Sequence, residues 1–80
     1  MLNRSISIEN MAYNSRFIQA RRGATVTWKN NDTVAHTVTS DTGTDPMSGV
    51  IPPGGSFSHT FMNTGTYSYH CDLHPSMHGT

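Results

Sequence analysis

Residues 66–77, Thr-Tyr-Ser-Tyr-His-Cys-Asp-Leu-His-Pro-Ser-Met, contain a strand-like run that leads directly into a short loop. Tyr67, Tyr69 and Cys71 alternate with polar side chains, a period of two that is typical of a β-strand with one buried face. Cys71 is therefore expected to point into the core at the end of its strand. His74 and Met77 follow at intervals of three, as C-x-x-H-x-x-M.

The side chains of this loop form a soft, mixed ligand set. A thiolate, an imidazole and a thioether favour copper over hard cations such as Mg²⁺ or Ca²⁺. Copper sites that transfer electrons combine two histidines, one cysteine and a weak axial methionine. Cys71, His74 and Met77 supply all of these except one histidine. A complete site therefore requires a histidine from elsewhere in the chain.

His36 is the candidate for this second histidine. It shares one face of a predicted strand, Val34–Thr39, with Val34 and Val38, and so is expected to point inward. A buried imidazole without a partner costs free energy, and coordination of a metal removes part of that cost. Taken singly, a histidine on an apolar face or a lone methionine is more often a core residue. The combination of four such residues favours a copper site.

The remaining pattern is all-β. Short stretches with a period of two are bounded by turn residues such as Asn30-Asn31-Asp32 and Pro52-Pro53-Gly54-Gly55. No stretch shows a helical period over ten residues. The segment from Ser40 to Gly49 is rich in Asp, Thr, Gly and Ser and is expected to be a loop. Six such stretches can be delimited: residues 34–39 and 66–71, named above, and residues 5–8, 16–20, 24–29 and 56–62. With the turn signals between them, they predict a β-sandwich of about seven short strands.

Length and composition limit the possibilities further. The 80 residues are expected to form one domain, residues 1–80. Five basic and five acidic residues give no basic excess, which argues against a nucleic-acid partner. The single cysteine excludes an internal disulfide. No apolar run approaches the ~20 residues needed to span a bilayer. The N-terminus has no apolar core of a signal peptide, so an exported protein would be represented here by its mature domain or by an excised part of it.

The whole constellation resembles the cupredoxins, the small blue copper proteins, and within them the amicyanin- and plastocyanin-like domains. The spacing of Cys71, His74 and Met77 matches the short amicyanin-type loop. The resemblance extends to residues 26–32 and 36–41, around the first histidine of that family. It also covers residues 53–57 and 65–71, which look like the later turn and the ligand strand. It implies a Greek-key β-sandwich with one type 1 copper ion.

The resemblance also implies roles for individual residues. His36, Cys71 and His74 would form a trigonal plane around copper, and Met77 would be the weak axial ligand. Thr37 would offer its backbone N–H to the sulfur of Cys71. Redox partner proteins would dock near His74 and Pro75. The implied location is periplasmic or otherwise extracytoplasmic, and the implied function is electron transport by a monomer, not enzymatic catalysis.

The sequence departs from the family in two places. Asp72 stands where the family often has Thr or Ser, and its carboxylate is expected to favour oxidised copper and lower the potential. The family also continues into a final strand rich in valine, whereas this sequence stops at Gly79-Thr80. The usual final strand is therefore expected to be missing. Unpaired backbone groups at that position would favour a dimer or a strand swap.

Other functions are weighed against electron transfer. A copper carrier or storage module would use the same ligands, and it remains the main alternative. An immunoglobulin-like module without metal is a third interpretation. Methionine is a poor zinc ligand, which disfavours a structural zinc site. Three further histidines are expected to lie outside the site: His59 as a packed core residue, and His70 and His78 in contact with solvent.

Overall fold

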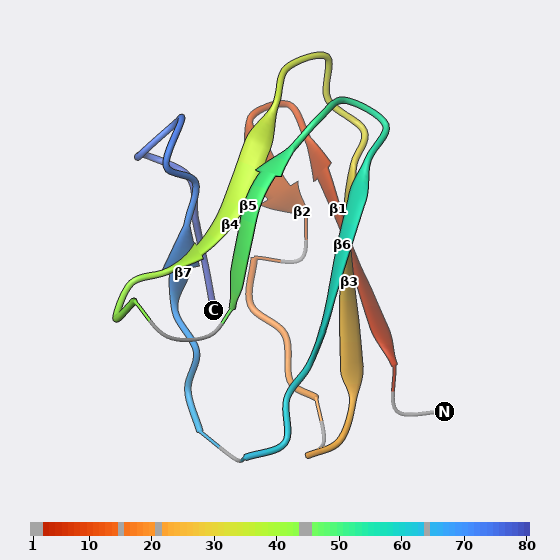
Figure 1. Cartoon of the computed structure of the whole chain (residues 1–80), viewed down its shortest axis with the longest axis vertical. Helices are drawn as coiled ribbons and strands as arrows, with labels where there is room; N and C mark the ends of the chain where they lie inside the picture. The colour runs from red at the N-terminus through yellow and green to blue at the C-terminus, as the bar shows by residue number, and fades with distance from the viewer. Residues whose placement is uncertain (1–2, 15, 21, 44–45, 64) are drawn as a thin grey trace.

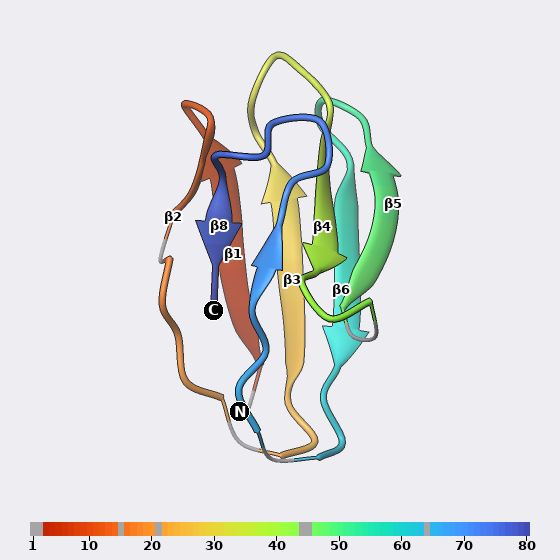
Figure 2. The same cartoon turned by 90° about the vertical axis from the view of Figure 1, so that its left-hand side faces the viewer.

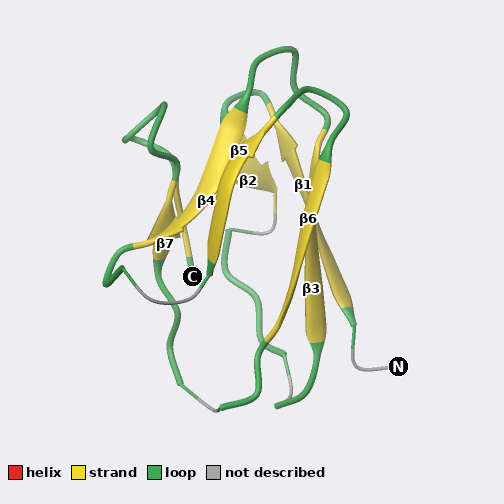
Figure 3. Ribbon diagram, in the orientation of Figure 1, coloured by secondary structure: helices red, strands yellow, loops and turns green. Residues whose placement is uncertain are grey.

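The structure, a computed structural model, describes residues 3–14, 16–20, 22–43, 46–63 and 65–80. These residues form eight strands joined by loops (Figure 3). The strands are β1 (Arg4–Glu9), β2 (Ala12–Asn14), β3 (Thr25–Asn30), β4 (His36–Ser40), β5 (Met47–Ile51), β6 (Ser56–Thr60), β7 (Tyr69–His70) and β8 (His78–Gly79). Within the part of the chain that is described, no helix is long and apolar enough to cross a membrane.

The strands form two four-stranded sheets that face each other (Figure 1). The first has the order β2-β1-β3-β6 and the second the order β5-β4-β7-β8. Strands β1 and β3 are parallel, and the other pairs are antiparallel. This arrangement is the all-β sandwich expected from the sequence and is consistent with a Greek key.

The core lies between the sheets and is centred on Trp28. Its ring packs edge-on against Tyr69 from the facing sheet, at 5.5 Å between centroids. Phe57 and Phe61 contact it from its own side. Fully burying an apolar side chain stabilises the fold by ~1.5–3 kcal/mol. The other buried members of this cluster are Ile6, Ile8, Tyr13, Val26, Val38, Ile51, Cys71 and Met77.

Most of the predicted strands are confirmed, with ends shifted by a few residues. Strands β1, β3, β4 and β6 fall within or next to the expected ranges. Ile6, Ile8, Val26 and Trp28 are buried, as their alternation predicted. The strand expected from Thr66 to Cys71 is shorter, because only Tyr69 and His70 form ladder pairs.

Two predictions about strands were wrong. Residues 16–20 are not a strand in the structure, which has β2 at Ala12–Asn14 instead. They make isolated backbone bonds to Thr80 and no continuous ladder. The expected loop Ser40–Gly49 contains the start of β5, although its residues 44–45 lie outside the described part. Strand β5 was missed because it is an edge strand that keeps Met47 and Val50 exposed, so no period of two marks it.

The sheet position beside β7 is occupied, whereas the sequence predicted that the final strand is missing. Strand β8 pairs with β7 through Tyr69 opposite Gly79 and His70 opposite His78. The backbone of Thr80 then bonds to the segment 16–18. Strand β8 is only two residues long, but it fills the position that was expected to attract a second chain.

Glycine is required at position 79 by the ring of Tyr69. A Cβ atom on Gly79 would lie well inside van der Waals contact with that ring. Tyr69 cannot easily move, because it is buried and packs against Tyr13 and Trp28. The last strand therefore lies flat across an aromatic side chain of the core.

A tight hairpin turn joins β1 to β2. Glu9 pairs with Ala12, which leaves Asn10 and Met11 as a two-residue loop. Both have positive φ angles, 54° and 59°, as a type I′ turn requires. Asparagine tolerates this conformation, but the left-handed region is unfavourable for methionine. A strained residue at this place needs support from its surroundings.

His70, which precedes Cys71 in the chain, lies between two carboxylates. Its Nδ1 atom is 2.5 Å from Asp41 and its Nε2 atom is 3.0 Å from Asp72. The hydrogen bond with Asp41 is the main reason why the pKa of His70 is raised above its ordinary value. The prediction that His70 is simply solvated was incomplete, because its side chain is only 27% exposed and is paired.

We expect Gly79→Ala to lower the free energy of unfolding by ~1–3 kcal/mol, the usual cost of overpacking a core. Denaturant unfolding of the copper-free protein would measure the change. Ser76→Ala, at an exposed position of the preceding loop, is the control and should change little. Equal stabilities for the Gly79 variant and the wild type would contradict the contact with Tyr69.

The His70 cluster predicts a pH-dependent contribution to stability. A histidine with a raised pKa in the folded state stabilises the fold below its unfolded pKa of ~6.5. That contribution is lost as the pH rises through the folded pKa. Asp41→Asn should therefore destabilise the copper-free protein most below pH ~6.5 and progressively less at higher pH. A stability difference that is constant from pH 5 to 9 would contradict this linkage.

Candidate metal centre

The candidate site lies at one end of the sandwich, where four connections gather (Figures 1 and 2). They are the β1–β2 turn, the β3–β4 loop, the β5–β6 turn and the loop between β7 and β8. His36 is the first residue of β4, and Cys71 directly follows β7. The pairing of β4 with β7 therefore brings residues 35 positions apart to the same end.

The loop from Cys71 to Met77 consists of two successive turns. His74 N–H donates to the carbonyl of Cys71, and Met77 N–H donates to the carbonyl of His74, at 3.3 and 2.9 Å. Cys71 N–H donates to the carbonyl of Met77 and closes the loop. These bonds explain the spacing of three, because each turn advances the chain by three residues and returns it to the same side.

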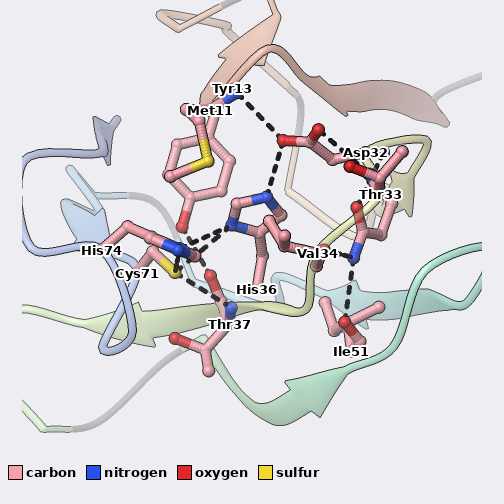
Figure 4. A network of polar contacts seen from close by, with 11 residues as sticks. Met11, Tyr13, Asp32, Thr33, Val34, His36, Thr37, Ile51, Cys71 and His74 are labelled. Atoms are coloured by element: carbon pink, nitrogen blue, oxygen red, sulfur yellow. Dashed lines mark hydrogen bonds and ion pairs between the residues drawn. The ribbon is translucent and has the colours of Figure 1, made fainter.

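Three atoms that could hold a metal ion converge in the candidate site. The Nδ1 atoms of His36 and His74 each lie 3.6 Å from Cys71 Sγ and 3.1 Å from each other. Figure 4 shows the two rings and the sulfur directed toward one another. His36 and Cys71 are fully buried, whereas His74 is partly exposed. Only His74 among these three therefore reaches the surface.

The size of this triangle fits a metal ion. A point equidistant from the three atoms lies about 2.0 Å from each. Metal–imidazole bonds are ~2.0–2.1 Å and metal–thiolate bonds ~2.3 Å, as known for zinc. One sulfur and two imidazole nitrogens are the equatorial donors of an electron-transfer copper site.

Thr37 connects the site to the sheet. Its backbone N–H donates to Cys71 Sγ at 3.3 Å, as the family resemblance implied. Its hydroxyl accepts the N–H of Asp72, and its carbonyl accepts the hydroxyl of Tyr13 from the facing sheet. Burial raises the pKa of Tyr13, so its hydroxyl remains a donor. Thr37 is thus held through its hydroxyl and its carbonyl while its backbone N–H points at the sulfur.

A second network holds the β3–β4 loop. The buried side chain of Asn30 donates to the carbonyls of Val34 and Ile51 and accepts the N–H of Asp32. The carboxylate of Asp32 lies 2.9 Å from Nε2 of His36. This hydrogen bond is the main reason why the pKa of Asp32 is lowered. The β3–β4 loop therefore positions His36 and also places the carboxylate of Asp32 at Nε2, on the far side of the ring from Cys71.

The structure brings three of the four predicted site residues together, and it buries the fourth. Met77 is 4% exposed and belongs to the same core cluster as Cys71. His59 packs between the rings of Phe57 and Phe61 but is only half-buried, so it is packed as expected without being a core residue; His78 is exposed, as expected.

Sequence reasoning missed two residues of the site. Asp32 was identified only as a turn residue, although its position four residues before a predicted inward histidine was an available signal. Tyr13 gave no such signal, because its contact with Thr37 depends on how the two sheets pack.

Comparison with known proteins agrees with this geometry. Residues 3–80 match the family described as the cupredoxin-like domain. Amicyanin from Paracoccus denitrificans is 33% identical over 92% of this chain, and amicyanin from Paracoccus versutus is 31% identical. The chain spans about 60% of the length of these curated relatives.

Solved structures show the same fold. An amicyanin variant in its Cu(I) form superposes with a TM-score of 0.84 at 28% identity, covering 99% of this chain and 79% of that one. A purple cupredoxin from Nitrosopumilus maritimus has a TM-score of 0.84 at 30% identity, covering 94% and 93%. The donor set and these similarities together support one type 1 copper ion as the cofactor. The chain belongs to the cupredoxin-like domain family.

Proposed function

We propose that this domain carries single electrons between redox partner proteins, with His36, Cys71 and His74 as equatorial copper ligands and Met77 as the axial one. The observation that supports this most directly is the triangle formed by one thiol sulfur and two Nδ1 atoms. Copper bound there would supply a one-electron couple. With copper bound, the same three side chains would be occupied as ligands, so we propose an electron carrier and not an enzyme.

The surrounding residues suit this task because they hold the ligands in place. Thr37 donates a hydrogen bond to Cys71 Sγ, which withdraws charge from the sulfur and tunes the potential. Tyr13 fixes the carbonyl of Thr37, and Asn30 fixes the loop before His36. A site that is held by the fold in this way needs little rearrangement when its charge changes.

His74 is the proposed port for electrons. It is the one partly exposed member of the triangle, and its neighbour Leu73 is 50% exposed. An apolar surface beside an exposed ligand allows a partner to approach closely without displacing strongly bound water. We therefore propose that partners dock around His74 and Pro75, and that the protein works in the periplasm or another extracytoplasmic space.

Adding copper(II) to the purified protein should produce an intense visible charge-transfer band from the bond between sulfur and copper. Cys71→Ser should abolish the band. The control His78→Gln retains Cys71 and should keep the band. A wild type without the band would refute the proposed site. Reversible oxidation and reduction of the bound copper would support electron transfer. Tight copper(I) binding without an accessible copper(II) state would instead support the alternative, a protein that carries or stores copper.

The proposed port can be tested by self-exchange of electrons between oxidised and reduced copies. Leu73→Glu places like charges opposite each other when two copies meet, so the rate at low salt should fall on the order of tenfold. The potential should stay nearly the same. Met62→Glu is the matched control, because Met62 is 65% exposed but follows β6 at the other end of the sandwich. Equal rates for both variants would place the port elsewhere.

A further inference from the structure

The carboxylate of Asp32 lies against Nε2 of His36, the ring nitrogen that faces away from Cys71 and His74. Its Oδ2 atom lies 2.9 Å from Nε2 of His36 and also accepts the N–H of Met11 at 3.0 Å. Its Oδ1 atom accepts the N–H of Thr33. The side chain of Asp32 is 15% exposed and that of His36 is fully buried. Figure 4 shows this carboxylate on the opposite side of the imidazole from Cys71 and His74.

This contact decides which nitrogen of His36 carries the hydrogen. An ionised carboxylate only accepts hydrogen bonds, so Nε2 must be the protonated nitrogen of the neutral ring. Nδ1 then presents a lone pair toward Cys71 Sγ and Nδ1 of His74. Without Asp32, the ring could instead hold a hydrogen on Nδ1 and donate it to the sulfur. In that tautomer the lone pair is on Nε2, and Nδ1, the nitrogen that faces Cys71 and His74, has none available for a metal.

Asp32 is itself held from two directions. Its backbone N–H donates to the buried side chain of Asn30, which fixes the start of the loop. Its carboxylate is bonded to the amide of Met11, a residue that the β1–β2 turn keeps at a positive φ. The turn of one sheet and the first residue of β4 in the other are thus joined through one carboxylate. In this left-handed conformation, the backbone N–H of Met11 points at the carboxylate of Asp32.

We propose that Asp32 is a positioning residue that locks His36 in the Nε2–H tautomer and strengthens its Nδ1 atom as a metal donor. A negative charge behind the imidazole increases the basicity of the ligating nitrogen. A stronger donor favours the more positive oxidation state, so Asp32 lowers the reduction potential. This second effect rests on the proposed copper site, whereas the tautomer belongs to the protein without metal.

The tautomer can be measured on the copper-free protein labelled with ¹⁵N-histidine. At pH 8, the long-range ¹H–¹⁵N spectrum of the wild type should show His36 with its hydrogen on Nε2. Asp32→Ala should shift the ring toward the Nδ1–H form or a mixture. Asp32→Asn keeps one acceptor oxygen and should retain the wild-type tautomer. It is the second variant to measure if Asp32→Ala does not fold. A wild-type ring with its hydrogen on Nδ1 would overturn the proposal.

The charge effect is tested by the potential of the copper-loaded protein. Asp32→Asn should reduce the preference for copper(II) about tenfold, which corresponds to a rise of ~59 mV for one electron. The matched control is Asp72→Asn. Asp72 follows Cys71, but its carboxylate bonds to His70 and Thr39 and is 57% exposed, so its removal should raise the potential less. Both variants keep Cys71 and should keep the visible band.

The outcomes separate the two proposals. Equal shifts for Asp32→Asn and Asp72→Asn would mean that Asp32 changes the potential only as a nearby charge and not through His36, which contradicts the proposed strengthening of Nδ1 as a donor. Absence of the visible band in the wild type would refute the copper site, but it would leave the tautomer measurement valid. An Nε2–H ring in the wild type that is lost in Asp32→Ala supports the positioning role in either case.

Discussion

The antiparallel pairing of β4 with β7 is the constraint on which the site depends. It sets Thr39 opposite His70 and Ser40 opposite Tyr69, and it thereby places Thr37 and His36 beside Cys71. A slip of one residue would turn His36 and Val38 toward solvent, because side chains alternate between the faces of a strand. The buried neighbours Val38 and Tyr69 oppose such a slip. Hydrophobic burial and the convergence of the proposed ligands therefore require the same register.

Much of this site could be predicted because its residues lie at strand ends with clear alternation. The inward directions of His36 and Cys71 follow from the parity of Val38 and Tyr69. Prediction failed where that signal was absent. Strand β5 exposes Met47 and Val50 and resembles a loop in composition, so only its pairing with β4 defines it. The segment 16–20 places Phe17 and Ile18 next to each other and so shows no strict alternation, and its backbone lacks a continuous partner.

Side chains that support the proposed ligands were harder to foresee from the sequence than the grouping of His36, Cys71 and His74. Asp32 and Tyr13 reach the site from different elements, and their contacts depend on loop conformation and on the distance between the sheets. The pairing of His70 with Asp41 joins residues 29 positions apart in the same way. Alternation in the sequence shows which face of the sheet a side chain occupies. It does not show which residue a polar side chain on that face will hydrogen-bond.

The contiguity of Cys71, His74 and Met77 has a consequence for folding. Three of the four proposed ligands lie on seven consecutive residues and need only two turns to converge. An unfolded chain could therefore still bind copper(I) through this segment, without His36. Binding to the unfolded state reduces the stabilisation that a ligand gives to the native state. Copper would then stabilise the native fold by less than its full binding energy, and refolding could begin with the metal already attached to the chain.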